Sequence, residues 1–207
     1  MKHSASKSFT AFLGPELVAS GTLSQLALAL RSRLKKKSND MPLVFDDDTG
    51  NPVELDLRGT AAEVAGRYAD SPAFEQTKSS EQIPLTPSRG RPRLGVIARE
   101  VTLLPEHWEW LAAQPGGASV VLRKLVHQAR QANAERDQKR HVQERAYKVM
   151  SALAGNLPGF EESSRALFAG ELNRLARTAH AWPADIRDYV LRLATSKPVP
   201  ATESKPA

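Results

Sequence analysis

Three arginines alternate with glycine and proline before the middle of the chain, at Arg89, Arg91 and Arg93 in the segment SRGRPRL. Glycine and proline disfavour a helix, so we expect an extended arm whose guanidinium groups reach outward. Arginine keeps its charge at physiological pH and donates several hydrogen bonds to phosphate oxygens. The spacing therefore predicts contacts with the phosphates or the minor groove of a nucleic acid.

A second anion-binding candidate is the glycine turn in QPGGASVVLRKL. Gly117 and Ser119 stand where a helix is expected to begin, and backbone N–H groups at a helix N-terminus attract phosphate. Arg123 and Lys124 follow on the outward face of the same helix. We therefore expect a phosphate clamp at this turn, although two glycines that merely separate two helices fit the same residues.

The residue patterns of common enzymes are missing. No serine stands in a G-x-S-x-G setting, and no P-loop or G-x-G-x-x-G follows a strand. The absence of cysteine excludes disulfides and cysteine-ligated zinc. The five histidines have no metal-ligand spacing: His3, His107, His127, His141 and His180. We therefore predict no catalysis, no cofactor and no bound metal.

The positive charge is concentrated in the middle of the chain. Residues 88–148 carry 12 Lys and Arg against 6 Asp and Glu, residues 1–87 carry 10 against 11, and residues 149–207 carry 7 against 6. A basic stretch attracts a polyanion, although a solvated helix face has the same composition. With 41% hydrophobic residues, no signal-peptide pattern and no long apolar run, we expect a soluble cytoplasmic protein without membrane contact.

The first third, residues 8–69, is predicted to be a small α+β domain of order ββαββα. Thr22 is the expected N-cap of a helix over 22–34, whose apolar stripe is Leu23, Leu26, Ala27 and Leu30. Apolar and charged residues alternate over 53–58, as in a strand with one solvated face. DDDTGN at 46–51 indicates a hairpin turn rather than a calcium loop, because it lacks a closing glutamate.

The rest of the chain outside the centre is predicted to be linker, helix and tail. Residues 70–88 are rich in Ser, Pro and Gln, which is typical of a flexible linker. The charged helix from Gln131 to Ala154 is expected either to stand alone or to continue the preceding one. Further helices are expected over 161–169, 171–180 and from Pro183 onward, within a helical segment 156–194, followed by a disordered tail at 195–207.

The central module occupies residues 89–155 and begins with the arm. A β-prone run from Gly95 to Leu104 ends at Pro105, where a short helix starts, and QPGG separates it from a second helix with Ser119 near its start. Residues 95–130 resemble the ribbon-helix-helix family of bacterial repressors. The resemblance implies a homodimer in which two chains pair their strands and insert the resulting ribbon into the major groove of double-stranded DNA.

The strand register decides which side chains would face the bases. In one register Thr102 faces out, together with Ala98 and Glu100; in the other Arg99 does, together with Val101 and Leu103. Both registers stay open, and Arg99 and Thr102 are the candidates for base contact.

Two further resemblances concern the arm and the whole chain. The Arg-Gly-Arg-Pro core at 89–92 resembles an AT-hook, which implies arginines lying along a narrow A·T minor groove. From FTAFLG through LVFDD, VELDLRG and LPEHWEWLAAQPGGASVVLRKLV to WPADIRDYVLRLA, the chain looks like a bacterial family defined only as a domain of unknown function.

We therefore predict an α+β protein that binds double-stranded DNA as a homodimer, as a bacterial transcriptional regulator. The alternative is an interaction or adapter protein without nucleic-acid binding, whose helices beyond Gln131 bind a protein partner. An enzyme using the amino-terminal region ranks third.

Overall fold

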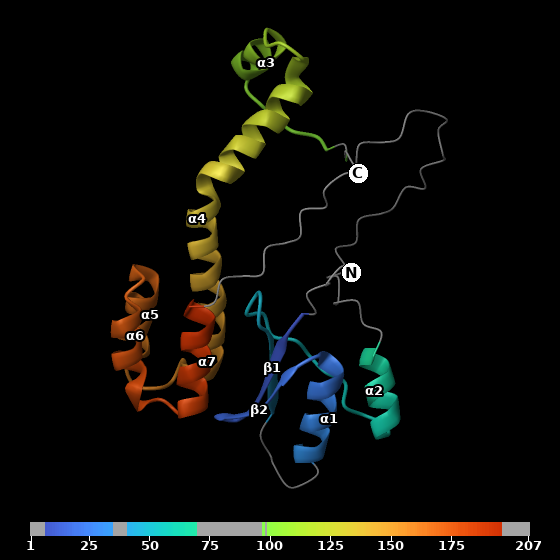
Figure 1. Cartoon of the computed structure of the whole chain (residues 1–207), viewed down its shortest axis with the longest axis vertical. Coiled ribbons are helices and arrows are strands. Elements are labelled where there is room, and N and C mark those ends of the chain that lie inside the picture. The colour runs from blue at the N-terminus through green and yellow to red at the C-terminus, as the bar shows by residue number, and fades with distance from the viewer. Residues whose placement is uncertain (1–6, 35–40, 70–96, 98, 196–207) are drawn as a thin grey trace, which may run out of the picture. The chain divides into compact units, whose positions relative to one another are not determined.

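The computed structural model describes residues 7–34, 41–69, 97 and 99–195, and the fold is α+β (Figure 1). Within these residues the chain forms a three-stranded antiparallel sheet and seven α-helices, the first of which lies between the second and third strands. The chain divides into two compact units, one made of 1–75 with 136–200 and the other of 76–135 with 201–207. The predicted linker and arm, at 70–96, lie outside the described residues.

The sheet has the order β2-β1-β3 and is made of β1 (Phe9–Leu13), β2 (Glu16–Gly21) and β3 (Pro42–Asp46). Helix α1 (Leu23–Leu34) follows β2, and the four residues of its predicted stripe are buried. The N-cap prediction is confirmed, because the N–H of Gln25 donates to Thr22 Oγ1 and the N–H of Thr22 donates to the Gln25 side chain.

The hairpin turn after β3 is confirmed. The N–H of Gly50 donates to the carbonyl of Asp46 at 2.8 Å, and Gly50 has a φ of +67° that favours glycine. The calcium loop finds no support, since no group of three or more His, Asp or Glu side chains in the described ranges could hold a metal ion.

The fourth strand predicted over 53–58 does not form. Only an isolated bridge joins Pro52 to Phe45, although Val53, Leu55 and Leu57 still pack against the core beneath α1. The physical reason lies in two arginines, Arg31 and Arg67, whose guanidinium groups donate to the carbonyls that a neighbouring strand would otherwise satisfy: Asp56, Leu57, Arg58 and Gly59. Helix α2 (Ala61–Ala69) then follows, in agreement with the last helix of the predicted ββαββα order, and the N–H of Glu63 donates to Thr60 Oγ1.

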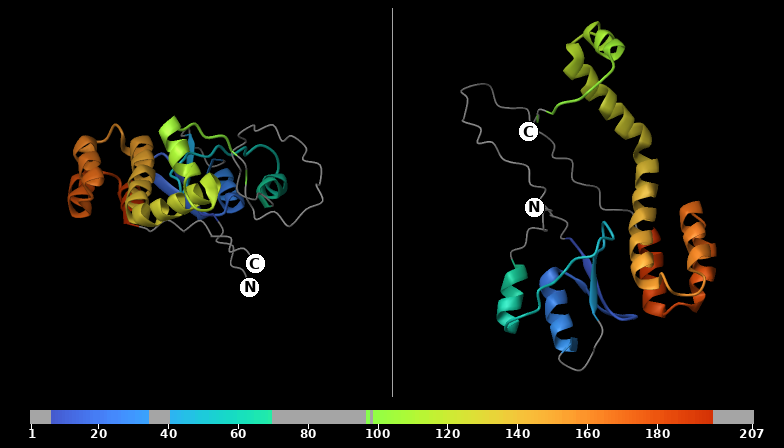
Figure 2. Two further views of the ribbon diagram at one scale, coloured as in Figure 1. Left: turned by 90° about the horizontal axis from the view of Figure 1, so that it is seen from above. Right: turned by 180° about the vertical axis from the view of Figure 1, so that it is seen from behind.

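The carboxyl-terminal helices cover the second face of the sheet. Helices α5 (Phe160–Ala169), α6 (Leu172–Thr178) and α7 (Ala184–Thr195) lie beside the second half of α4 (Gly117–Ala154), as Figure 2 shows. Phe12 and Phe45 belong to their core, whereas Phe9, Ala11 and Val44 belong to the core under α1. The predicted tail contributes one described residue, Thr195, which ends α7.

The two compact units group the chain differently from the domains predicted from the sequence. The amino-terminal region 8–69 and the helical segment 156–194 were expected to be separate, but they form one unit. The reason is visible in β1, where Phe9 and Ala11 are buried on one face and Phe12 on the other, so that the sheet needs a cover on each side.

Candidate nucleic-acid interface

The described part of the second unit is a helical hairpin made of α3 (Pro105–Ala112) and the first half of α4. Leu104 is extended, with φ −63° and ψ 151°, and Pro105 takes the first helical position because it needs no N–H partner there. Gly116 and Gly117 turn the chain with φ values of +90° and +74°. The predicted helix boundaries and the glycine break between the two helices are therefore confirmed.

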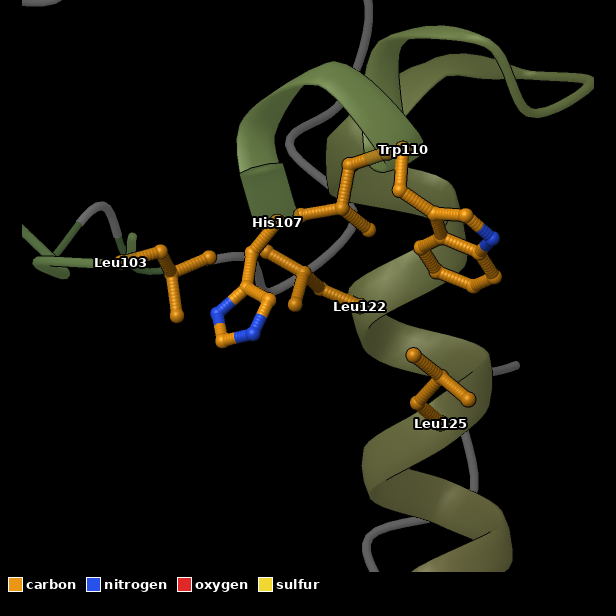
Figure 3. Close-up of a pocket in the computed structure, with 6 residues that line it drawn as sticks. Leu103, His107, Trp110, Leu122 and Leu125 are labelled. Carbon is orange, nitrogen blue, oxygen red and sulfur yellow. The ribbon is translucent and has the colours of Figure 1, made fainter. Parts of the chain in front are cut away.

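An apolar hollow of about 240 Å³ lies between the two helices of this hairpin (Figure 3). Leu111 is its most buried side chain, with 2% of its surface exposed. The other lining residues come from α3, from α4 and from the segment before α3: Leu103, His107, Trp110, Leu122 and Leu125. A hollow of this composition accepts an apolar side chain rather than a charged ligand.

Many large apolar side chains of this hairpin are exposed in the single chain. The most exposed is Ile97 at 78%, which precedes α3 together with Val101 at 54% and Leu104 at 57%. The remainder lie on α3 and α4: Trp108 at 42%, Trp110 at 52%, Leu125 at 42% and Val126 at 57%. Eight residues of α3 cannot cover the apolar side of a longer helix. The hairpin therefore leaves its core incomplete.

The described residues of the segment predicted to be a strand over 95–104 do not form a strand. Residue 97 and residues 99–104 have no strand conformation, and residues 95, 96 and 98 lie outside the described residues. A strand needs a neighbour to satisfy its backbone groups, and the described part of this unit supplies none. Arg99 and Thr102 are both exposed in this irregular segment.

The turn residues are placed at the start of α4 as expected, but one of them is already bonded. The N–H of Gly117 donates to the carbonyl of Gln114 at 3.2 Å, because that bond closes the turn. Ser119 is exposed, and its carbonyl accepts from Arg123 Nε at 3.1 Å. Lys124 is exposed on the same helix, one position further on. Arg89, Arg91 and Arg93 lie outside the described residues.

The charge of the hairpin itself is balanced. Residue 97 and residues 99–135 together contain four cations and four anions. The cations are Arg99, Arg123, Lys124 and Arg130, and the anions are Glu100, Glu106, Glu109 and Glu135. The basic excess of the central third therefore comes from the arm and from α4 beyond residue 135.

A polar cluster in the first unit escaped prediction from the sequence. The carboxylate of Asp47 accepts hydrogen bonds from the hydroxyls of Ser8 at 2.7 Å, Thr10 at 2.8 Å and Tyr189 at 2.8 Å. Burial, followed by the charge of Asp47, raises the pKa of Tyr189. Asp47 and Tyr189 alone are 142 positions apart, so no local pattern could have indicated the cluster.

Arg145 is the most buried cation near this cluster, with 3% of its surface exposed. Its Nε and Nη2 donate to the carbonyl of Leu193 at 3.1 and 2.9 Å. Burial lowers the pKa of Arg145, while Asp48 and Asp47 oppose that effect. The hydroxyls are bonded to the Asp47 carboxylate, and the Arg145 guanidinium is bonded to backbone carbonyls. The arrangement is therefore suited to joining the sheet to α4 and α7 rather than to binding a ligand.

Comparisons with known proteins identify a family. No helix in the described ranges combines the length and apolarity needed to cross a bilayer. No curated protein and no solved structure shows significant similarity to the chain. One family model matches residues 8–194, which span the sheet, the hairpin and the carboxyl-terminal helices. On this match, the chain belongs to the bacterial family described as "uncharacterized protein conserved in bacteria (DUF2239)".

Proposed function

We propose that the protein binds double-stranded DNA as a homodimer and acts as a bacterial transcriptional regulator. The observation that carries this proposal is the incomplete core of the hairpin, whose apolar residues are exposed where half of a two-chain module would need a partner. A second chain would supply the missing neighbour for residues 95–104 and the missing cover for the helices.

In such a dimer the cationic residues have distinct roles. Arg89, Arg91 and Arg93 contact phosphates or the minor groove, and Arg99 and Thr102 lie on the ribbon facing the bases. The N–H groups around Ser119 hold a phosphate with the help of the α4 dipole. Arg123 and Lys124 also contact the DNA backbone.

A second candidate function is protein binding without nucleic acid. The balanced charge of residues 97–135 and the apolar lining of the hollow favour it, since a DNA-binding surface is usually strongly basic. In this case α3 and α4 would receive an apolar segment of another protein.

A titration of labelled DNA duplexes at two salt concentrations separates these functions. We expect the wild type to bind unrelated duplexes at about 50 mM salt and to lose a large part of its affinity at about 200 mM. Arg91→Ala should weaken binding to all sequences and reduce the salt slope by about 1, because one phosphate contact is lost.

The matched control is Arg33→Ala, which removes an exposed arginine at the end of α1. Its affinity and salt slope should equal those of the wild type. An Arg91→Ala slope identical to the wild-type slope contradicts the role of the arm. No binding by the wild type at low salt contradicts DNA binding altogether and favours the second function.

A further inference from the structure

Apart from Leu125, which lines the hollow shared with α3, the residues of α4 from Arg123 to Asp137 are not covered by any other described element. All residues from Arg123 to Asp137 are exposed, among them Leu125 and Val126. A helix that is solvated on every side gains little from packing, and its intrinsic propensity alone gives marginal stability. The apolar residues within it therefore indicate a missing partner rather than a solvent face.

These apolar residues form a single line along the helix. Positions 118, 122, 125, 129 and 132 follow one another at alternating steps of four and three, which is the spacing of a coiled-coil seam: Ala118, Leu122, Leu125, Ala129 and Ala132. The four basic residues of this stretch fall on the opposite, outward positions: Arg123, Lys124, His127 and Arg130.

We propose that α4 of a second copy packs antiparallel on this seam, with the two-fold axis at the level of residue 127. In that register Leu122 faces the partner's Ala132, and Leu125 faces the partner's Ala129. Each large residue then meets a small one, which fills the interface evenly and lets the helices approach closely. A parallel pair would place alanine against alanine and leave voids at three of the five levels, 118, 129 and 132.

The residues beside the seam also fit a second copy. Val126 meets the partner's Val126, Gln128 meets the partner's Gln128, and Ser119 meets the partner's Asn133. The only charged flanking residue between 119 and 135 is Glu135, which faces the partner's Val121. No like charges oppose each other across the interface, and the outward cations stay free for another partner.

This inference rests on the proposed dimer and adds the seam that joins it. The chain contains no cysteine, so single cysteine variants report on the register without background. Val126→Cys and Gln128→Cys should each form disulfide-linked dimers of the full chain under mild oxidation. The reason is that the two copies of each residue are separated by only about 3 Å along the helix axis.

The controls for this cross-linking are Lys124→Cys and Gln131→Cys, which lie on the outward face and should stay monomeric on denaturing gels. Ala118→Cys distinguishes the orientation of the helices. Two copies of this residue are separated by about 27 Å along an antiparallel pair but are adjacent in a parallel one. Cross-linking of Ala118→Cys, or none at positions 126 and 128, overturns the proposal.

A second measurement uses light scattering to determine the mass of the intact chain. Ala129→Asp should raise the dimer dissociation constant at least 10-fold by placing a charge in the seam, whereas Ala134→Asp, on the outward face, should leave it unchanged. A dimeric wild type unaffected by Ala129→Asp overturns the seam. Duplex binding measured in parallel tests the proposed function separately: cross-links without DNA binding contradict only that function, and DNA binding without the cross-links contradicts only the seam.

Discussion

The side chain of Tyr189 connects α7 to the sheet through one hydrogen bond and one ring contact. Its hydroxyl donates to Asp47 at 2.8 Å, and its ring lies 5.3 Å from Phe12, centroid to centroid. Only 2% of the residue is exposed, so both the ring and the hydroxyl depend on protein partners. Ionisation would place a phenolate next to a carboxylate in a buried site, which is unfavourable.

This environment predicts the alkaline stability of the protein. Burial and Asp47 raise the pKa of Tyr189 in the folded state, so its contribution to stability is complete below the ordinary tyrosine pKa of about 10. As the pH rises above that value, the unfolded state loses the proton first and the free energy of unfolding falls. Denaturant titrations between about pH 8 and pH 11 should show this fall.

Tyr189→Phe should be less stable at neutral pH by about 2 kcal/mol, because a hydrogen bond to a carboxylate is lost, and its alkaline fall should be smaller. Tyr147→Phe is the control and should keep the full fall, since it leaves Tyr189 intact. A Tyr189→Phe profile parallel to the wild type above pH 10 would show that the alkaline effect originates elsewhere.

At the scale of elements, the turn after β3 is pressed against α4. A Cβ on Gly50 would lie 2.3 Å from the carbonyl oxygen of Arg145, and the φ of +67° already disfavours other residues. Gly50→Ala should therefore destabilise the protein by more than about 2 kcal/mol, measured by chemical denaturation. The reason is that both the backbone and the packing of α4 have to shift.

Gly66→Ala provides the matched comparison. Gly66 lies within α2, and a Cβ there would meet no atom within 4 Å. Alanine is the better helix former, so this variant should gain about 0.5–1 kcal/mol. Equal effects of the two substitutions would contradict the close contact between the turn and α4.

The elements that could be predicted from sequence are those with local signals. Thr22 and Pro105 mark the starts of α1 and α3, and the spacing of apolar residues identifies α7. The strands predicted at 53–58 and 95–104 have no comparable local signal. A strand depends on a neighbour that the local sequence does not specify, and at 56–59 arginine side chains take the place of that neighbour.

The candidate site likewise combines residues that the sequence predicts with contacts that it does not predict. The turn at Gly117 and the exposed positions of Arg99, Thr102, Arg123 and Lys124 agree with the sequence, because they follow from helix periodicity and glycine conformation. The apolar face of α4 remains open because α3 is short and ends at Ala112. The polar cluster around Asp47 depends on contacts between distant parts of the chain, which periodicity does not reveal.

At the scale of the whole molecule, the first unit is built from both ends of the chain. Residues up to 69 supply the sheet, and residues after 136 supply the helices that cover one of its faces. Phe12 and Phe45 of the sheet share a single apolar core with Leu175 and Val190 of the helices. We therefore expect the sheet and α5–α7 to unfold together, as one cooperative unit.

Leu175→Ala tests this cooperativity, because Leu175 is fully buried in α6. Removing its side chain should cost about 3 kcal/mol, and hydrogen exchange should show the same loss of protection in β1 and β3 as in α6 and α7. Amides of α3, which belong to the second unit, should keep their exchange rates. Leu28→Ala, at a site 38% exposed on α1, is the control and should cost less than about 1 kcal/mol. If β1 keeps its protection while α6 loses it, the sheet and the helices are separate domains after all.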